Sequence, residues 1–136
     1  MKNGYKLIPV LLLLCGASPA VTQTQESFRV KKLLEKDLNA YAGGDLLLSV
    51  GEITLAPGAT GTKHRHPGPT FVYVLEGAIE VELEGTAAKV YRPGETFYED
   101  ARQLHISTRN VSQTETARIL GYHLSRKGES LTQPEK

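Results

Sequence analysis

The sequence has little that could cross-link the chain or stack on a ligand: no tryptophan, one cysteine and 7% aromatic residues. A single cysteine excludes a disulfide framework, so a packed core must hold the fold together. With so few aromatic residues, the chain does not suggest a surface that binds carbohydrate by stacking. The length of 136 residues is typical of one domain and sufficient to bury a hydrophobic core.

Neither sign of charge is in excess, since 16 basic residues face 15 acidic ones. A chain so balanced lacks the basic surface that nucleic acids require, and we expect no nucleic-acid partner. A long hydrophobic run is missing as well. The apolar stretch Leu7 to Leu14 is far shorter than the ~20 residues of a membrane-spanning helix, so we expect no membrane span.

Residues 1–20 have the layout of a secretory signal peptide. Lys2 and Lys6 give a positive start, an apolar run follows, and small residues lead to Ala20. We expect cleavage after Ala20 and export of the mature chain to the periplasm or the medium. Loss of the two lysines leaves 14 basic residues against 15 acidic ones, a net charge of −1. The alternative is a lipoprotein anchored through Cys15, to which the bulky Leu14 before it is poorly suited.

Short strand-like segments and turn glycines fill the rest of the chain and predict an all-β sandwich or barrel. The expected strands are residues 46–55, 71–75, 79–83, 88–91, 104–108 and 117–124. In 79–84 apolar and acidic residues alternate strictly, so one face is predicted to be buried and the other solvated. We therefore expect an N-terminal extension at 21–45, a barrel at 46–125 and a C-terminal tail at 126–136.

The segment 28–38 fits two structures. Val30, Leu34 and Leu38 recur every four residues, as on one face of a helix. The same residues could instead form a strand that lies along another subunit. Either way, a small barrel cannot bury all of these side chains alone, and we expect a homodimer, the commonest symmetric assembly.

Two histidines, His64 and His66, flank Arg65 in an extended stretch before Pro67. Residues two apart in a strand point to the same side, so both imidazoles should share one volume while Arg65 faces away. Paired neutral imidazoles are ligands that divalent transition metals favour. A histidine pair alone is weak evidence, because such pairs also occur by chance on wet surfaces.

The surrounding residues resemble the two motifs of the cupin superfamily. Gly58, His64, His66 and Gly77 match most of the first motif, and Pro93-Gly94-Glu95 with His105 and Asn110 resembles the second. The resemblance covers roughly residues 46–124. It implies a double-stranded antiparallel β-barrel of the jelly-roll type. It also implies a divalent metal ion, bound by His64, His66 and His105.

One position departs from the family pattern. Thr70 stands where cupins usually have a glutamate, and a hydroxyl cannot supply the charge of a carboxylate. The expected site is three neutral imidazoles with open positions, which does not distinguish among Fe, Mn, Zn, Ni and Cu. Glu99, Gln103 and His123 remain as candidates for a fourth ligand, each with an ordinary structural role as the alternative. Tyr98 is left open between the pocket and the surface.

Two functions follow from this pattern. The first is a metal-dependent dioxygenase or isomerase that acts on a small molecule, since open coordination positions can bind a substrate. The second is a module that binds a small ligand or the metal without chemistry. The fold does not choose between them, because cupins host many functions. The sequence singles out no catalytic residue and no cofactor other than the metal.

Overall fold

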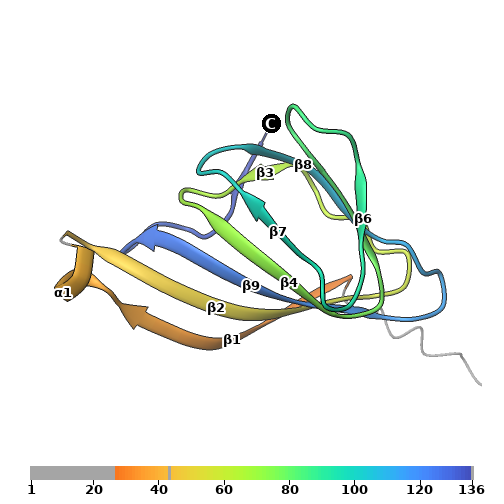
Figure 1. Cartoon of the computed structure of the whole chain (residues 1–136), viewed down its shortest axis with the longest axis horizontal. Coiled ribbons are helices and arrows are strands. Elements are labelled where there is room, and N and C mark those ends of the chain that lie inside the picture. Colours follow the sequence, from red (N-terminus) through yellow and green to blue (C-terminus); the bar gives the residue numbers. More distant parts are fainter. Residues whose placement is uncertain (1–26, 43, 136) are drawn as a thin grey trace, which may run out of the picture.

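The computed structural model describes residues 27–42 and 44–135 (Figure 1). The predicted signal peptide, with Cys15, lies outside this range. Two five-stranded sheets make up the described part. Every strand pairing is antiparallel, which confirms the predicted all-β, jelly-roll-like fold. No helix among the described residues is long and apolar enough to cross a membrane.

Sheet A has the strand order β1 (Phe28–Asp37), β2 (Leu46–Leu55), β9 (Ala117–Arg126), β4 (Thr70–Glu76), β7 (Thr96–Glu99). Sheet B has the order β10 (Gln133–Pro134), β3 (His64–Arg65), β8 (Leu104–Asn110), β5 (Ile79–Leu83), β6 (Lys89–Tyr91). The only described helix is the four-residue α1 (Asn39–Ala42), between β1 and β2. Sheet A extends past sheet B on the side that carries α1 (Figure 1).

The alternation of the sequence decides which side chains enter the space between the sheets. In β5 each apolar residue is buried and each glutamate is partly exposed, as the sequence predicted. In β4, Val72 and Val74 point inward while Phe71 and Tyr73 remain exposed on the outside. Apolar side chains from both sheets form one core: Leu55, Val72, Val74, Ile79, Val81, Leu83, Phe97, Ala117, Ile119 and Ala59.

The helical interpretation of 28–38 is wrong, because this segment is the strand β1. It pairs with β2 of the same chain, from Phe28 opposite Leu55 to Asp37 opposite Leu47, with a bulge near Leu33. The misleading spacing has a simple cause: an edge strand with a bulge loses strict alternation, and apolar residues can then recur every four residues by chance. Its side chains remain largely exposed, Val30 by 72%.

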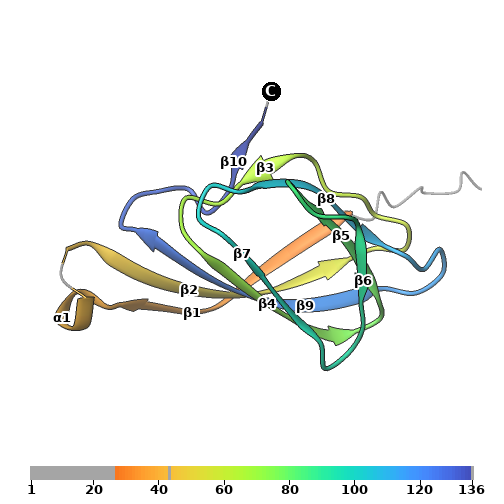
Figure 2. The ribbon, with the colours of Figure 1, turned by 45° about the horizontal axis from the view of Figure 1, so that its top comes forward.

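Both sheets therefore extend beyond residues 46–125. From the segment expected to precede the barrel comes β1, and from the expected tail comes β10, which pairs with β3 (Figure 2). These edge strands lack a buried apolar face, so the sequence gives little signal for them. Their position matters because β10 brings the C-terminal segment to the strand that carries His64.

Candidate metal centre

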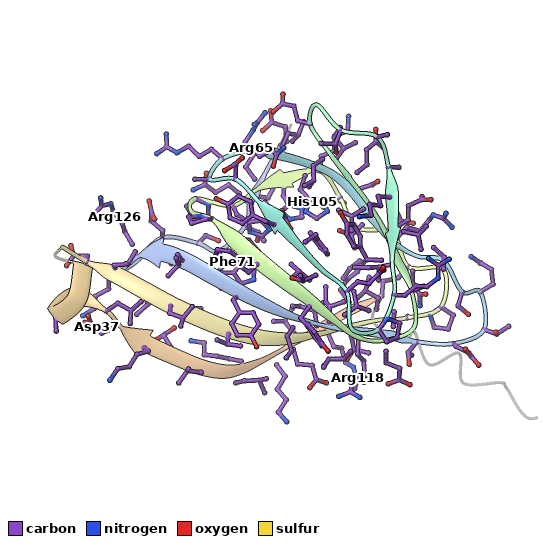
Figure 3. All side chains as sticks on the ribbon, in the orientation of Figure 1. Asp37, Arg65, Phe71, His105, Arg118 and Arg126 are labelled. Carbon is purple, nitrogen blue, oxygen red and sulfur yellow. The ribbon has the colours of Figure 1, made fainter. Side chains whose placement is uncertain are left out.

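Strands β3 and β8 bring three histidines together. His64 lies directly opposite His105 in the register of these two strands, and His66 follows on the same side of the chain. One potential ligand atom from each ring lies within 4.8 Å of the other two. His105 lies in the space between the two sheets, whereas Arg65 points away from it, as predicted (Figure 3).

His64 and His66 each donate a hydrogen bond from Nδ1 to a different backbone carbonyl. His64 Nδ1 donates to the Thr62 carbonyl at 2.8 Å, and His66 Nδ1 donates to the Leu131 carbonyl at 2.6 Å. A carbonyl can only accept, so each Nδ1 carries the proton and each Nε2 has a free lone pair in the neutral ring. The two Nε2 atoms face each other at 3.2 Å.

His105 lies between a carboxylate and its own strand. Its Nδ1 is 2.9 Å from Glu99 Oε2, and its Nε2 is 3.1 Å from the Ser107 carbonyl and hydrogen-bonded to Thr108 Oγ1. Its ring stacks on His64, with centroids 4.7 Å apart. His66 and His105 are almost fully buried.

Two groups of the cluster, His64 and Glu99, have pKa values below their usual range. Burial lowers the pKa of His64, although its bond to Thr62 acts in the opposite direction, so the ring is neutral at neutral pH. For Glu99, burial raises the pKa. The hydrogen bond with His105 and the charges of the nearby histidines outweigh it, and the pKa falls below its usual value. Glu99 is therefore an anion with 2% of its surface exposed.

The candidates for a fourth ligand separate clearly in space. Glu99 contacts His105 and also lies 3.5 Å from His66 Nε2. His123 lines the same cavity, but its Nδ1 is hydrogen-bonded to Thr70 Oγ1 at 3.1 Å, and burial lowers its pKa to about 4. Gln103 lies in a surface turn and donates to the Glu84 carbonyl, away from the histidines.

A cavity of about 400 Å³ opens beside the histidines. Apart from the polar cluster, its walls are mainly apolar, and Ser130, Leu131 and Thr132 of the C-terminal segment line it too. Tyr98 does not line this cavity; it is 46% exposed on the outer side of sheet A. Most of the apolar lining comes from strands of sheet A: Phe28, Val30, Val50, Ile53, Val72, Phe97 and Ile119.

A comparison with protein families finds one match, to the cupin domain, over residues 51–121. This range covers more than half of the chain and includes all three histidines. The chain belongs to the cupin superfamily. The resemblance inferred from the two histidine motifs is thereby confirmed. The histidine cluster lies at the pairing of β3 with β8.

Several solved structures have a similar fold. The polyketide cyclase RemF from Streptomyces resistomycificus is similar over 82% of this chain and 72% of its own, with 19% identity and a TM-score of 0.60. A cupin-like protein from Thermotoga maritima has 17% identity and a TM-score of 0.59, over 79% of this chain and 75% of its own. A recombinant oxalate oxidase in complex with glycolate has 26% identity and a TM-score of 0.54, over 74% and 53%. No curated protein sequence matches significantly.

Proposed function

We propose that this cupin binds one divalent first-row transition metal ion through His64, His66 and His105. The observation that carries the proposal is the 3.2 Å distance between the Nε2 atoms of His64 and His66. With both Nδ1 protons donated to carbonyls, the lone pairs of the two Nε2 atoms face each other. Only a cation can relieve that repulsion, either a proton or a metal ion.

The proton is the weaker explanation for this arrangement. Burial lowers the pKa of His64, which disfavours a charged imidazolium there at neutral pH. His64, His66 and His105 would hold a metal ion together. Such an ion would supply the Lewis-acid or redox chemistry that an isomerase or a dioxygenase requires.

The cavity supports a small-molecule ligand next to the metal. Its mainly apolar walls suit a compound with an apolar body, and its polar end suits one or two oxygen atoms near the histidines. We therefore propose a metal-dependent enzyme, an oxygenase or isomerase of such a molecule. The likeness to an oxalate oxidase supports an enzymatic role.

A binding module without chemistry is the second candidate. One observation favours it: His123, the histidine of the cavity outside the triad, has a pKa of about 4 and is a weak base at neutral pH. An enzyme of this kind would have to rely on the metal and on Glu99 for proton transfer. Turnover by the metal-loaded protein would decide for the enzyme.

Metal content after dialysis tests the proposal directly. The parent protein, loaded with Zn²⁺, Mn²⁺ or Fe²⁺ and dialysed, should keep about one ion per chain, whereas His105→Ala should keep little. His123→Ala is the matched control, since it removes a buried histidine of the same cavity and should leave the metal content unchanged. Equal metal in parent and His105→Ala would show that His105 is not a ligand.

We also propose that the protein is a homodimer. A row of exposed apolar residues lies on β1, β9, β4 and β7, on the outer face of sheet A. Such a row can pair with itself about a twofold axis. In cross-strand order its members are Leu34, Tyr122, Phe71 and Tyr98. Light scattering at micromolar concentration should give a dimer, and Phe71→Lys should shift it to a monomer. A monomeric parent protein would reject the proposal.

Export remains a proposal that rests on residues 1–20 of the sequence. The mature protein should begin near Val21 and lie in the periplasm or medium. Intact-mass analysis of protein from the native cell decides the question. A mass that still includes the leader, or a diacylglycerol on Cys15, would contradict it.

A further inference from the structure

The carboxylate that Thr70 lacks is present on the neighbouring strand. In the register of β4 and β7, Glu99 lies directly opposite Thr70. Directly opposed residues of an antiparallel pair point to the same side of the sheet, with Cβ atoms about 5 Å apart. Both residues line the cavity beside the histidines. A glutamate on β7 can therefore reach the volume that a glutamate on β4 would fill.

Distances around Glu99 match those between ligands of one ion. Metal bonds of about 2.0–2.2 Å place neighbouring ligand atoms about 3.4 Å apart in a tetrahedron and about 2.9 Å apart in an octahedron. Here His64 Nε2 is 3.2 Å from His66 Nε2, and His66 Nε2 is 3.5 Å from Glu99 Oε2. Glu99 Oε2 is 2.9 Å from His105 Nδ1. Each contact joins two atoms that can both donate a lone pair to a metal.

His105 can follow the same hydrogen-bond pattern as the other two histidines. If its Nε2 donates to the Ser107 carbonyl, its Nδ1 presents a lone pair beside Glu99. The three rings would then each donate to a backbone carbonyl: that of Thr62, of Leu131 and of Ser107. In that tautomer three imidazole lone pairs and one carboxylate oxygen would face a common volume.

We propose that Glu99 is the fourth protein ligand of this metal centre, so that the ligand carboxylate comes from β7 instead of β4. The inference rests on the proposed metal site and adds to it. It gives an ion of charge +2 an anionic partner in a site where Glu99 is almost completely buried. It also changes the expected site from three neutral ligands to three imidazoles and one carboxylate.

The rival role for Glu99 is that of a positioning residue. In that role it accepts a hydrogen bond from His105 Nδ1, and His105 binds the metal through Nε2. Loss of such an outer partner also weakens metal affinity, by about 10- to 100-fold, so affinity of one variant does not separate the two roles. A second carboxylate placed on β4 does separate them.

The experiment compares the parent, Glu99→Gln and the double variant Glu99→Gln with Thr70→Glu, with Glu82→Gln as control. Glu82 is a carboxylate on β5 of sheet B and does not line the cavity. Each protein is loaded with Co²⁺, dialysed against a mild chelator, and assayed for bound metal and for its visible spectrum. Circular dichroism checks the folding of each variant.

We expect Glu99→Gln to lower Co²⁺ affinity by about 100-fold or more, beyond the loss expected for an outer partner. The double variant should regain most of it, because the new glutamate on β4 can reach the same volume. The visible bands of Co²⁺ should shift in Glu99→Gln and return toward the parent spectrum in the double variant. Glu82→Gln should match the parent.

Three results would overturn the proposal, and each has a separate reading. If the parent itself retains no Co²⁺, the metal site and the fourth ligand both fall. If Glu99→Gln binds as tightly as the parent, only the fourth ligand falls. If Glu99→Gln loses affinity, keeps the parent spectrum on residual metal and is not rescued by Thr70→Glu, Glu99 positions His105 instead. Glu99→Asp keeps the charge with a shorter reach and takes the place of the amide if Glu99→Gln fails to fold.

Discussion

The two ends of the space between the sheets differ in how the hydrogen-bonding capacity of their buried polar groups is satisfied. At one end, here called the closed end, Leu55, Ile79 and Ala117 are completely buried around Asn110. At the other, the histidine end, the buried residues His66, His105 and Glu99 are all ionisable. Strands such as β8 run through both, with His105 near one terminus and Asn110 at the other.

The difference lies in how donors and acceptors are matched. At the closed end Asn110 Nδ2 donates to the carbonyls of Ala56 and Glu115 at 3.0 and 2.8 Å, and its Oδ1 accepts from Ser112 N at 3.0 Å. Every polar atom of that side chain has a partner of the opposite kind. At the histidine end the Nε2 atoms of His64 and His66 face each other at 3.2 Å without a donor between them when both rings are neutral. The closed end satisfies its buried polar atoms within the protein, and the histidine end holds the metal ion that we propose.

The largest expected effect breaks the closed end. Asn110→Asp keeps the shape but turns a donor into a buried anion that faces carbonyl oxygens. We expect the free energy of unfolding to fall by about 4 kcal/mol, since an unpaired charge is buried and its hydrogen bonds are lost. Urea unfolding of the metal-free protein measures it. A loss below about 1 kcal/mol would mean that this end is open to water.

A smaller effect compares the turn glycines of the two ends. Gly77 has φ 72°, and a Cβ there would lie 2.9 Å from Ala117 Cα. Gly85 has φ 82° and nothing within 4 Å of such a Cβ. We expect Gly77→Ala to cost about 3 kcal/mol and Gly85→Ala about 1 kcal/mol, because only the first adds a clash to the backbone strain. Thermal or urea unfolding of the pair checks the order. Equal losses would show that packing at Gly77 is loose.

The sequence predicted the parts of the fold and site that depend on local pattern. Alternation in β5 and the spacing of His64 and His66 need only the pleat of a strand, and the cupin motifs supplied His105. The pairing of Glu99 with Thr70 is different, because β4 and β7 lie far apart in the sequence and meet only through the order of sheet A. The same holds for the Leu131 carbonyl behind His66, which a tail without a hydrophobic pattern brings into place.

The smallest effect tests whether the histidine end tolerates the loss of a hydrogen bond that does not involve the metal. Thr70→Val keeps the side-chain shape and removes the hydroxyl bonded to His123 Nδ1, so we expect a loss of about 1 kcal/mol in the free energy of unfolding. Metal content after dialysis should not change, because the proposed ligands His64, His66, His105 and Glu99 are untouched. Urea unfolding and metal analysis of one sample measure both quantities. A drop in bound metal would mean that the hydroxyl, or His123 through its hydrogen bond to it, contributes to metal binding. Thr70 on β4 would then have to be counted among the groups that bind the metal.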